Sequence, residues 1–319
     1  MNRICLVALV ILALSAGLAA AQPYPSRPVR LIIDFPAGGA SDALARLVGQ
    51  KLTEAWGQSI VYDNRPGANG IIAYGIAAKA PADGYSLILL STPFPLNAML
   101  QRKLSYDTVN DFVPAAFIAN YSNLLVVHPA VPARSIPEFI SYAKSKAGKL
   151  TYASSGNGSV QHLAMELLRR QAGFEAVHVP YAGSAPAVVE LLGGHVEAGV
   201  TILTTVLPHL RSGRIRALGV LSEKRAVQLP EVPTLAESGI PVVANGWGGI
   251  GAPAGIPRQI VERLNKEVGR IVSLPDVTEK IIALGGEPRH GTPEEFRRFI
   301  RDEVARWGPI VRESGAGAQ

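Results

Sequence analysis

Short apolar runs rich in β-branched residues alternate with helical patterns along most of the chain. Runs of this length between turn residues are typical of buried strands, and their alternation with helices indicates parallel α/β sheets. The runs predicted to form strands are Val29–Phe35, Ile60–Asp63, Leu87–Leu90, Leu124–His128, Leu150–Ala153, Val177–Pro180, Ala198–Leu203 and Ile215–Leu221. We therefore expect an α/β protein whose sheets are covered by helices.

Three segments carry clear helix signals. Between Ser159 and Ala172 the apolar residues recur at steps of three and one, which gives an amphipathic helix suited to covering a sheet. The segments Ser135–Glu138 and Thr292–Glu295 each place a hydroxyl three residues before a carboxylate. This spacing is that of a capping box, so we expect helices to begin at both places.

Proline and glycine are dense between Leu229 and Pro257. Both residues interrupt regular structure, so we expect no long element there and a crossing between two domains instead. The crossings are predicted near Ser122–Val127 and Val242–Gly248.

The composition is that of a globular protein with a modest basic excess. Of 319 residues, 48% are apolar and 18% are charged, which is enough apolar material for a sizeable core. The 31 Lys and Arg against 25 Asp and Glu give a net charge of +6 without a dense basic tract. This pattern suits an acidic small molecule better than nucleic acid, whose binders concentrate their basic residues.

The N-terminal segment matches a secretory signal, with Arg3, the apolar run Ile4–Leu18 and then small residues up to Ala21. The apolar run is shorter than the ~20 residues of a membrane-spanning helix. We expect cleavage after Ala21 and export, which leaves 298 residues, enough for two domains. The only cysteine, Cys5, lies in the removed segment, so no disulfide is expected.

Two strand-to-helix junctions, Leu31–Asp42 and Leu150–Ser159, are rich in glycine and hydroxyl groups. Glycine lets the backbone approach a ligand closely, and the next helix offers unpaired N–H donors at its positive end. No formally charged side chain lies between Pro36 and Ser41 or between Ser154 and Val160. Each junction can hold a carboxylate through amides and hydroxyls; alternatively, each is an ordinary turn in which a serine only caps the helix.

Other predicted strand ends supply further candidates. Thr92 and Phe94 follow the third predicted strand, where ligands of open α/β sheets bind. Tyr181 and Ser184 could reach a ligand in a closed form. Core packing is an equal alternative for Phe94, and packing beneath the hinge is favoured for Trp247.

Two further patterns are typical of a nucleotide site and of a metal site, but the evidence for each is weaker than for the two glycine-rich junctions. Gly246–Gly251 spells G-x-G-x-x-G, but Pro253 and Pro257 interrupt the helix that a nucleotide loop needs, so no nucleotide cofactor is expected. His162 and Glu166 lie four residues apart and could share a metal, yet no third ligand is evident. A structural role is favoured for His162, and no metal is expected.

Seven segments together match the pattern of one family, although each is weak alone. They are Tyr24–Arg30, Gly38–Arg46, Asn64–Ala68, Asp83–Tyr85, Tyr152–Gly158, His178–Pro186 and Ala252–Gly255. Through them, nearly the whole chain after the signal resembles the Bug, or TctC-like, family of periplasmic receptors for tripartite tricarboxylate transporters.

The resemblance implies a two-domain type II periplasmic-binding-protein fold, each domain a mostly parallel sheet flanked by helices, which closes on a ligand between them. Residues 22–124 and 244–319 are expected to form domain 1, and residues 125–243 to form domain 2. No cofactor is implied. The residues expected to bind the ligand are Phe35, Pro36, Ala37, Gly38, Gly39, Ala40, Ser41, Asp42, Thr92, Phe94, Ser154, Ser155, Gly156, Asn157, Gly158, Ser159, Tyr181 and Thr201.

The sequence departs from the family pattern at three positions. Ala40 stands where the family usually has glycine, Thr201 where it frequently has Asp, and Ala182 where it often has Lys. Because that Asp can meet a ligand amino group, Thr201 argues against aspartate or glutamate and toward a plain organic acid.

We therefore predict a non-catalytic, monomeric periplasmic receptor that captures a small carboxylate, such as a dicarboxylate or an aromatic acid, and delivers it to membrane transporter subunits. A ligand sensor of the same fold that feeds a membrane signalling kinase is the alternative. A remote alternative is a secreted hydrolase using Ser155 or Ser159 with His162, but the sequence lacks a G-x-S-x-G elbow and an evident acidic partner for the histidine.

Overall fold

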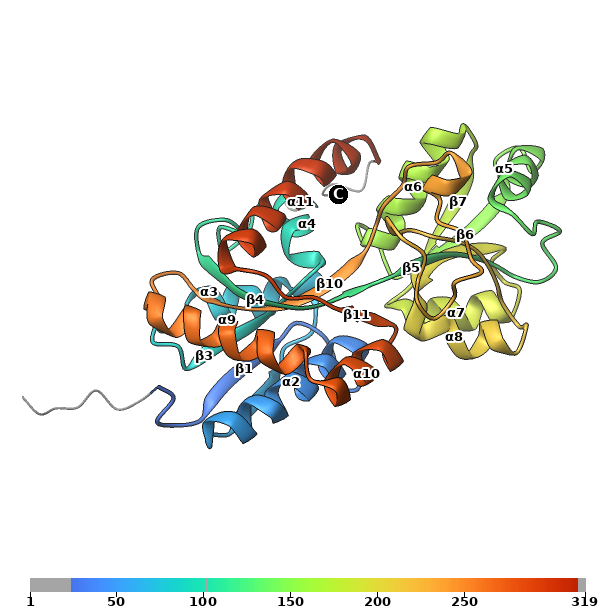
Figure 1. Cartoon of the computed structure of the whole chain (residues 1–319). Helices are drawn as coiled ribbons and strands as arrows, with labels where there is room; N and C mark the ends of the chain where they lie inside the picture. The colour runs from blue at the N-terminus through green and yellow to red at the C-terminus, as the bar shows by residue number, and fades with distance from the viewer. Residues whose placement is uncertain (1–23, 101–102, 315–319) are drawn as a thin grey trace, which may run out of the picture.

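The computed structural model describes residues 24–100 and 103–314 and contains two β-sheets, each flanked by helices (Figure 1). The prediction of an α/β protein with two sheets is confirmed. The predicted signal segment, with its cleavage after Ala21, lies outside the described residues. In the part of the chain that is described, none of the helices has the length and apolar content needed to cross a bilayer.

The first sheet has six strands in the order β11-β4-β10-β3-β1-β2. Strand β1 pairs in parallel with β2 and β3, whereas β10 pairs antiparallel with β3 and β4. The strands are β1 (Val29–Ile33), β2 (Ile60–Asn64), β3 (Ser86–Ser91), β4 (Phe112–Tyr121), β10 (Gly246–Pro253) and β11 (Gly286–Pro288).

Helices cover both faces of this sheet because alternate strand residues point to opposite sides. Leu31 and Ile33 pack against one group of helices (α2, α9 and α10), whereas Ile32 packs against the other (α3, α4 and α11). The elements are α2 (Ala40–Trp56), η2 (Ala68–Gly70), α3 (Ile71–Ala78), α4 (Pro93–Leu100), α9 (Arg258–Val272), α10 (Pro275–Ala283) and α11 (Pro293–Ser314). We call this sheet with its helices the first lobe.

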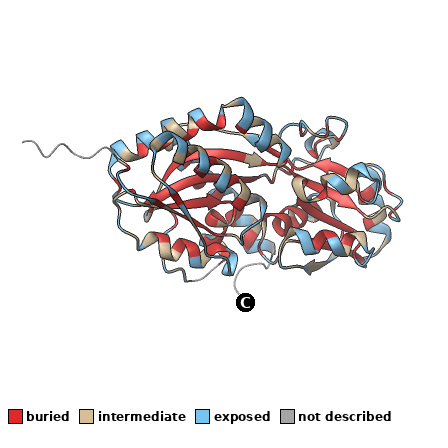
Figure 2. Cartoon of the chain, turned by 90° about the horizontal axis from the view of Figure 1, so that it is seen from below, coloured by how far each residue is buried: buried red, intermediate tan, exposed pale blue. Residues whose placement is uncertain are grey.

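The second sheet has five strands in the order β7-β6-β8-β5-β9. Its strands are β5 (Asn123–Val127), β6 (Leu150–Ser154), β7 (Ala176–Pro180), β8 (Ala198–Ile202) and β9 (Arg216–Val220). Its helices are α5 (Ile136–Ser145), α6 (Val160–Ala172), α7 (Ser184–Leu192), α8 (Leu203–Arg211) and η3 (Ala236–Ser238). We call this unit the second lobe; buried residues form the interior of both lobes (Figure 2).

Both sheets are mixed, but most strands of each run in one direction, as expected: β1, β2, β3 and β4 in the first sheet, and β6, β7, β8 and β9 in the second. Strand β6 is parallel to β7 and β8, but β5 is antiparallel to β8 and β9. The reason is the path of the chain between lobes: β4 ends at Tyr121 and β5 begins at Asn123, while β10 returns to the first sheet. A strand that arrives from the other lobe enters at the carboxyl edge of the parallel strands, so it runs against them.

Strand β10 contradicts the expectation that residues 229–257 hold no long element. All eight of its residues are buried between β3 and β4. A Cβ at Gly249 would lie 2.5 Å from a ring carbon of Phe296, and one at Gly251 would lie 2.5 Å from Leu90. These glycines allow neighbours to pack closely and do not break the strand. Trp247 packs with Phe296 at the same place, as predicted.

The three predicted helix starts are confirmed. Ser159 precedes α6, and its hydroxyl accepts the His162 N–H. Ser135 caps α5 by accepting the Glu138 N–H, while the Glu138 carboxylate accepts the N–H of Arg134. At α11, Thr292 and Glu295 form the full reciprocal capping box, which fixes the start of the longest helix.

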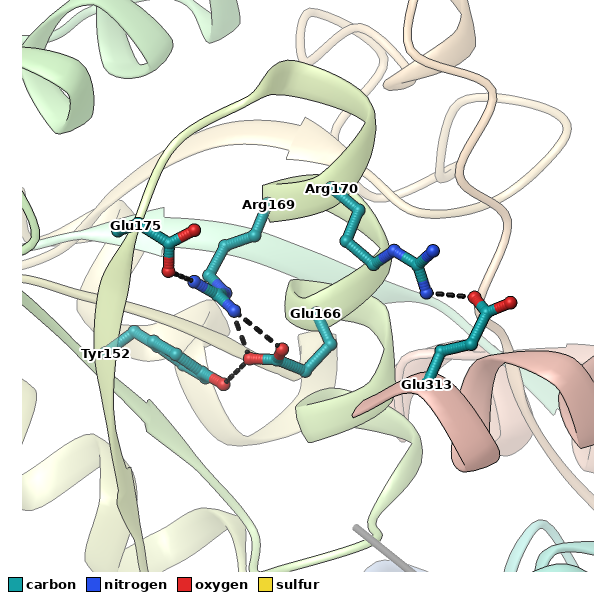
Figure 3. A network of polar contacts seen from close by, with 6 residues as sticks. All are labelled: Tyr152, Glu166, Arg169, Arg170, Glu175 and Glu313. Atoms are coloured by element: carbon teal, nitrogen blue, oxygen red, sulfur yellow. Dashed lines mark hydrogen bonds and ion pairs between the residues drawn. The ribbon is translucent and has the colours of Figure 1, made fainter. Parts of the chain in front are cut away.

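The C-terminal helix α11 joins the two lobes. Trp307 and Val311 belong to the same apolar cluster as Leu163 and other residues of α6. Near the ends of both helices, Arg170 of α6 pairs with Glu313 of α11 (Figure 3). The lobes are therefore connected by packing as well as by the crossing strands.

Candidate ligand-binding site

The first junction becomes a loop between β1 and α2, and Pro36 to Gly39 are exposed in it. Gly38 has φ 85°, a left-handed conformation that favours glycine. Gly39 is the N-cap of α2, and because glycine has no side chain, the first turn of the helix receives no capping hydrogen bond from it. Within the described residues the Ser41 hydroxyl, one residue into the helix, has no partner either. The loop thus leaves polar donors available at a positive helix end.

Asp42 braces this loop from within. Its Oδ2 accepts the Gly38 N–H at 2.9 Å and the Arg46 Nε–H at 2.8 Å, and its Oδ1 accepts from Asn64 at 2.9 Å. Burial opposes ionisation of Asp42, yet these hydrogen bonds hold its pKa below the ordinary value. Because both oxygens are occupied, this carboxylate shapes the loop rather than facing a ligand.

The second junction becomes the loop between β6 and α6, and it turns through Gly156 (φ 132°) and Gly158 (φ 71°). Asn157 at its tip is exposed. A Cβ on Gly158 would lie 2.7 Å from Cδ1 of Leu100, the last residue of α4. The loop of the second lobe therefore lies directly against the first lobe at Gly158.

The serine hydroxyls of this loop already have partners. Ser155 Oγ donates to Gln161 Oε1 at 2.7 Å, and Ser159 Oγ donates to the Gly156 carbonyl at 2.8 Å. Ser154 Oγ is fully buried and lies 2.6 Å from His178 Nε2. The N–H groups of Gly156, Gly158 and Ser159 also have partners, so the loop is held in shape by its own hydrogen bonds.

Two histidines support the second loop from below. His162 Nδ1 accepts the Gly158 N–H at 3.1 Å, and the His178 ring stacks on the His162 ring and on the Tyr152 ring. Burial, together with the His162 charge, lowers the pKa of His178 to about 4. Both rings are therefore neutral at neutral pH. The sequence favoured a structural role for His162, but nothing in it placed His178 beside His162.

Tyr152, whose ring stacks on His178, also belongs to a polar network with Glu166 and Arg169 (Figure 3). The Tyr152 hydroxyl donates to Glu166 at 2.6 Å, and Arg169 donates to Glu166 and to Glu175. Burial opposes the charge of Glu166, but these donors keep its pKa below the ordinary value. Glu166 is thus a structural partner of Arg169, and groups of three metal-binding side chains are absent from the described residues.

The structure places the remaining candidates in different surroundings. Phe94 is 1% exposed and packs edge-on against Tyr74 and Phe112, so it belongs to the core of the first lobe. Thr92 Oγ1 accepts the Trp247 N–H at 3.1 Å at the end of β3. Thr201 is buried at the end of β8, and its hydroxyl has no partner in the described chain. Ser184 opens α7, with Gly183 as the N-cap.

A buried carboxylate directly before the first loop is absent from the predicted set. Asp34 is 3% exposed, and its Oδ2 accepts from Tyr74 and Ser91, both at 2.5 Å. Its Oδ1 has no partner among the described residues. Burial raises the pKa of Asp34 to about 6 against these hydrogen bonds. A charged residue inside the apolar run 29–35 was the signal in the sequence.

The chain is similar to known receptors over most of its length. The family model described as the tripartite tricarboxylate transporter family receptor matches residues 44–316. The protein BugT of Bordetella pertussis is 39% identical over 323 residues, which cover 99% of each chain.

Two similar solved structures contain bound acids. The R. palustris protein Rpa4515, with adipate, has a TM-score of 0.84 and 39% identity, covering 92% of this chain and 98% of its own. MatC from Rhodopseudomonas palustris, with bound malate, has a TM-score of 0.80 and 31% identity, covering 90% and 100%. The expected periplasmic-binding-protein fold is confirmed by these likenesses. The chain belongs to the Bug, or TctC-like, family of tripartite tricarboxylate transporter receptors.

Proposed function

We propose that this receptor captures a small organic acid, with linear dicarboxylates as the preferred class, between the loops 35–42 and 154–159. One observation carries the proposal: each lobe ends a buried parallel strand in a glycine-containing loop that leads into a helix N-terminus, and the one charged side chain in these two loops, Asp42 in the first turn of α2, already has both oxygens occupied. Such sites bind anions through N–H groups and the helix dipole. Two of them, one in each lobe, suit a ligand with two carboxylates.

Several details support this assignment. The Asp42 carboxylate is fully occupied by the loop that it braces, so it adds little repulsion toward an acid. The unpartnered hydroxyls of Ser41 and Thr201, together with Thr92 and Tyr181, supply additional donors in the proposal. Phe94 is left out because its ring is enclosed. The adipate and malate in the two similar structures are both dicarboxylates.

Capture requires the lobes to move relative to each other. Residues 22–124 with 244–319 and residues 125–243 would act as the two domains, and the sheet assignments of β4, β5 and β10 support this division. A ligand that contacts both lobes at once favours the closed arrangement, because only that state makes all contacts.

The receptor would act in the periplasm after removal of the signal at Ala21, as a monomer, and would hand its ligand to membrane transporter subunits without chemical change. The arrangement of the serines supports a non-catalytic role. Ser155 and Ser159 donate to other partners, and Ser154, which does face a histidine, is fully buried. A nucleophile needs both a base and access to substrate.

Titration calorimetry and thermal shifts with the mature chain test the proposal. Succinate, malate and adipate are compared with their dimethyl esters, which keep the carbon chain but lose both charges. We expect an acid, and not its ester, to raise the melting temperature and to bind one molecule per chain, since a ligand stabilises the state that binds it. Recovery of the ligand unchanged supports the receptor role. Equal shifts with acids and esters, or none with any acid, would refute it.

A further inference from the structure

A chain of hydrogen bonds leads from the second loop into the buried interior. Ser155 Oγ donates to Gln161 Oε1 at 2.7 Å, Gln161 Nε2 donates to Asn123 Oδ1 at 3.1 Å, and Asn123 Nδ2 donates to the Ala244 carbonyl at 2.6 Å. Gln161 is 5% exposed and Asn123 is fully buried. All three bonds point in the same direction, from the loop to the segment just before β10. Bonds aligned in this way polarise and strengthen one another.

The far end of this chain is a closed ring of three hydrogen bonds, two between main-chain groups and one from the Asn123 side chain. The Leu221 N–H donates to the Asn123 carbonyl at 2.8 Å, and the Ala244 N–H donates to the Leu221 carbonyl at 2.7 Å. The Asn123 side chain completes the ring at the Ala244 carbonyl. Asn123 is the first residue of β5, and Ala244 lies on the way back to β10. The ring therefore ties together the outgoing and returning connections between the lobes.

We propose that Gln161 and Asn123 are positioning residues that couple the second loop to both connections between the lobes. A ligand carboxylate that accepts the Ser155 hydroxyl hydrogen bond in place of Gln161 leaves Gln161 Oε1 without its donor. A buried amide does not tolerate a lost partner, so Gln161 and Asn123 readjust together with the connections. The ligand in this mechanism comes from the proposed function, whereas the coupling itself is a property of the free protein.

Hydrogen exchange in the ligand-free protein tests the coupling directly. Ser155→Ala removes only the loop end of the chain, and Gln161→Met removes the middle while keeping the side-chain length. We expect both variants to speed exchange of the Leu221 and Ala244 amides at least threefold. Ser141→Ala, which removes an exposed hydroxyl of the same lobe, is the matched control and leaves these amides unchanged. Faster exchange confined to the loop and the start of α6 would overturn the proposal.

Ligand affinity gives a second, separate measurement. For the dicarboxylate of the panel that binds most tightly, Ser155→Ala and Gln161→Met are each expected to weaken binding about five- to thirty-fold. The double variant is expected to lose no more affinity than whichever single variant has the larger loss. Contacts in one network combine non-additively. Gln50→Met, at an exposed glutamine of α2, is expected to bind like the wild type.

Unchanged affinity in both single variants, or losses that multiply, would overturn the role in ligand binding. If the wild-type protein binds no acid while the exchange result holds, the proposed function fails and the coupling stands.

Discussion

The imidazole rings of His162 and His178 stack face to face beneath the loop 154–159, with centroids 3.9 Å apart and planes inclined by 6°. His162 Nδ1 holds the Gly158 N–H, and His178 Nε2 meets Ser154 Oγ. Two protonated rings would repel each other at this distance. The loop is therefore held in place by a histidine pair that must stay uncharged.

The first prediction is a loss of stability in mild acid. The folded pKa of His178 is lowered to about 4 from an ordinary 6.5, so between these values the unfolded chain binds more protons. The free energy of unfolding should rise with pH across this window. The stability that the neutral His178 contributes should be lost as the pH falls through the same window. In His178→Gln, which keeps a polar partner for Ser154, the free energy of unfolding should change with pH by about 1–2 kcal/mol less than in the wild type. Urea unfolding at pH 7, 6 and 5 measures it; parallel profiles for both proteins would contradict it.

The second prediction concerns Asp34 and has the opposite sign. Because burial raises its pKa to about 6 from 3.8, the folded protein binds the extra proton in this interval, and stability falls as the pH rises from about 4 to 6. As the pH rises over this interval, the free energy of unfolding of Asp34→Asn should increase by up to about 3 kcal/mol relative to that of the wild type. Denaturant unfolding measures the gain, with Asp302→Asn, at an exposed site, as the control. A difference independent of pH would contradict the prediction.

The third prediction tests the first loop by charge. Gly39 has φ −77°, and a Cβ there would meet only the Pro36 carbonyl at 3.6 Å, so a side chain fits. Gly39→Asp should leave the fold intact, since Asp is a favourable N-cap, but it should weaken binding of the carboxylate at least about tenfold by repulsion. Gly39→Asn has nearly the same size without the charge. Calorimetry compares the two, and equal affinity in both would argue against an acid at this loop.

Eight of the eleven described strands were predicted, because each is a short apolar run with clear boundaries, whereas β4, β10 and β11 were missed. The run Ala198–Leu203 became β8, Ala198–Ile202, with Leu203 as the first residue of α8. Strand β10 was hidden because its glycines look like chain breakers in the sequence. Only the approach of Phe296 and Leu90 explains them, and both lie far away along the chain.

The two candidate loops were predictable from the sequence as strand-to-helix loops, but their individual hydrogen bonds were not. Glycine and serine after a buried strand indicated where an acid could bind. The sequence could not show that the Ser155 hydroxyl donates its hydrogen bond to Gln161, because the choice among possible acceptors depends on their positions in three dimensions. It equally could not show that Asp42 is occupied by Asn64, which comes from the neighbouring strand β2.

The fourth prediction separates two contacts between α11 and α6. Trp307 is fully buried in the cluster that contains Leu163, whereas the paired side chains of Arg170 and Glu313 are 49% and 51% exposed. Trp307→Ala should cost about 3–5 kcal/mol, because it removes core shared by both lobes. Arg170→Gln should cost about 0–1 kcal/mol, because solvent weakens an exposed ion pair.

Urea unfolding of both α11–α6 variants gives these costs, with Trp307→Phe as an intermediate that keeps an aromatic ring. Circular dichroism before unfolding checks that each variant is folded. If Arg170→Gln proved as costly as Trp307→Ala, the lobes would be joined mainly by charge. The expected order instead assigns the connection to apolar packing, which persists in high salt, where screening weakens the ion pair.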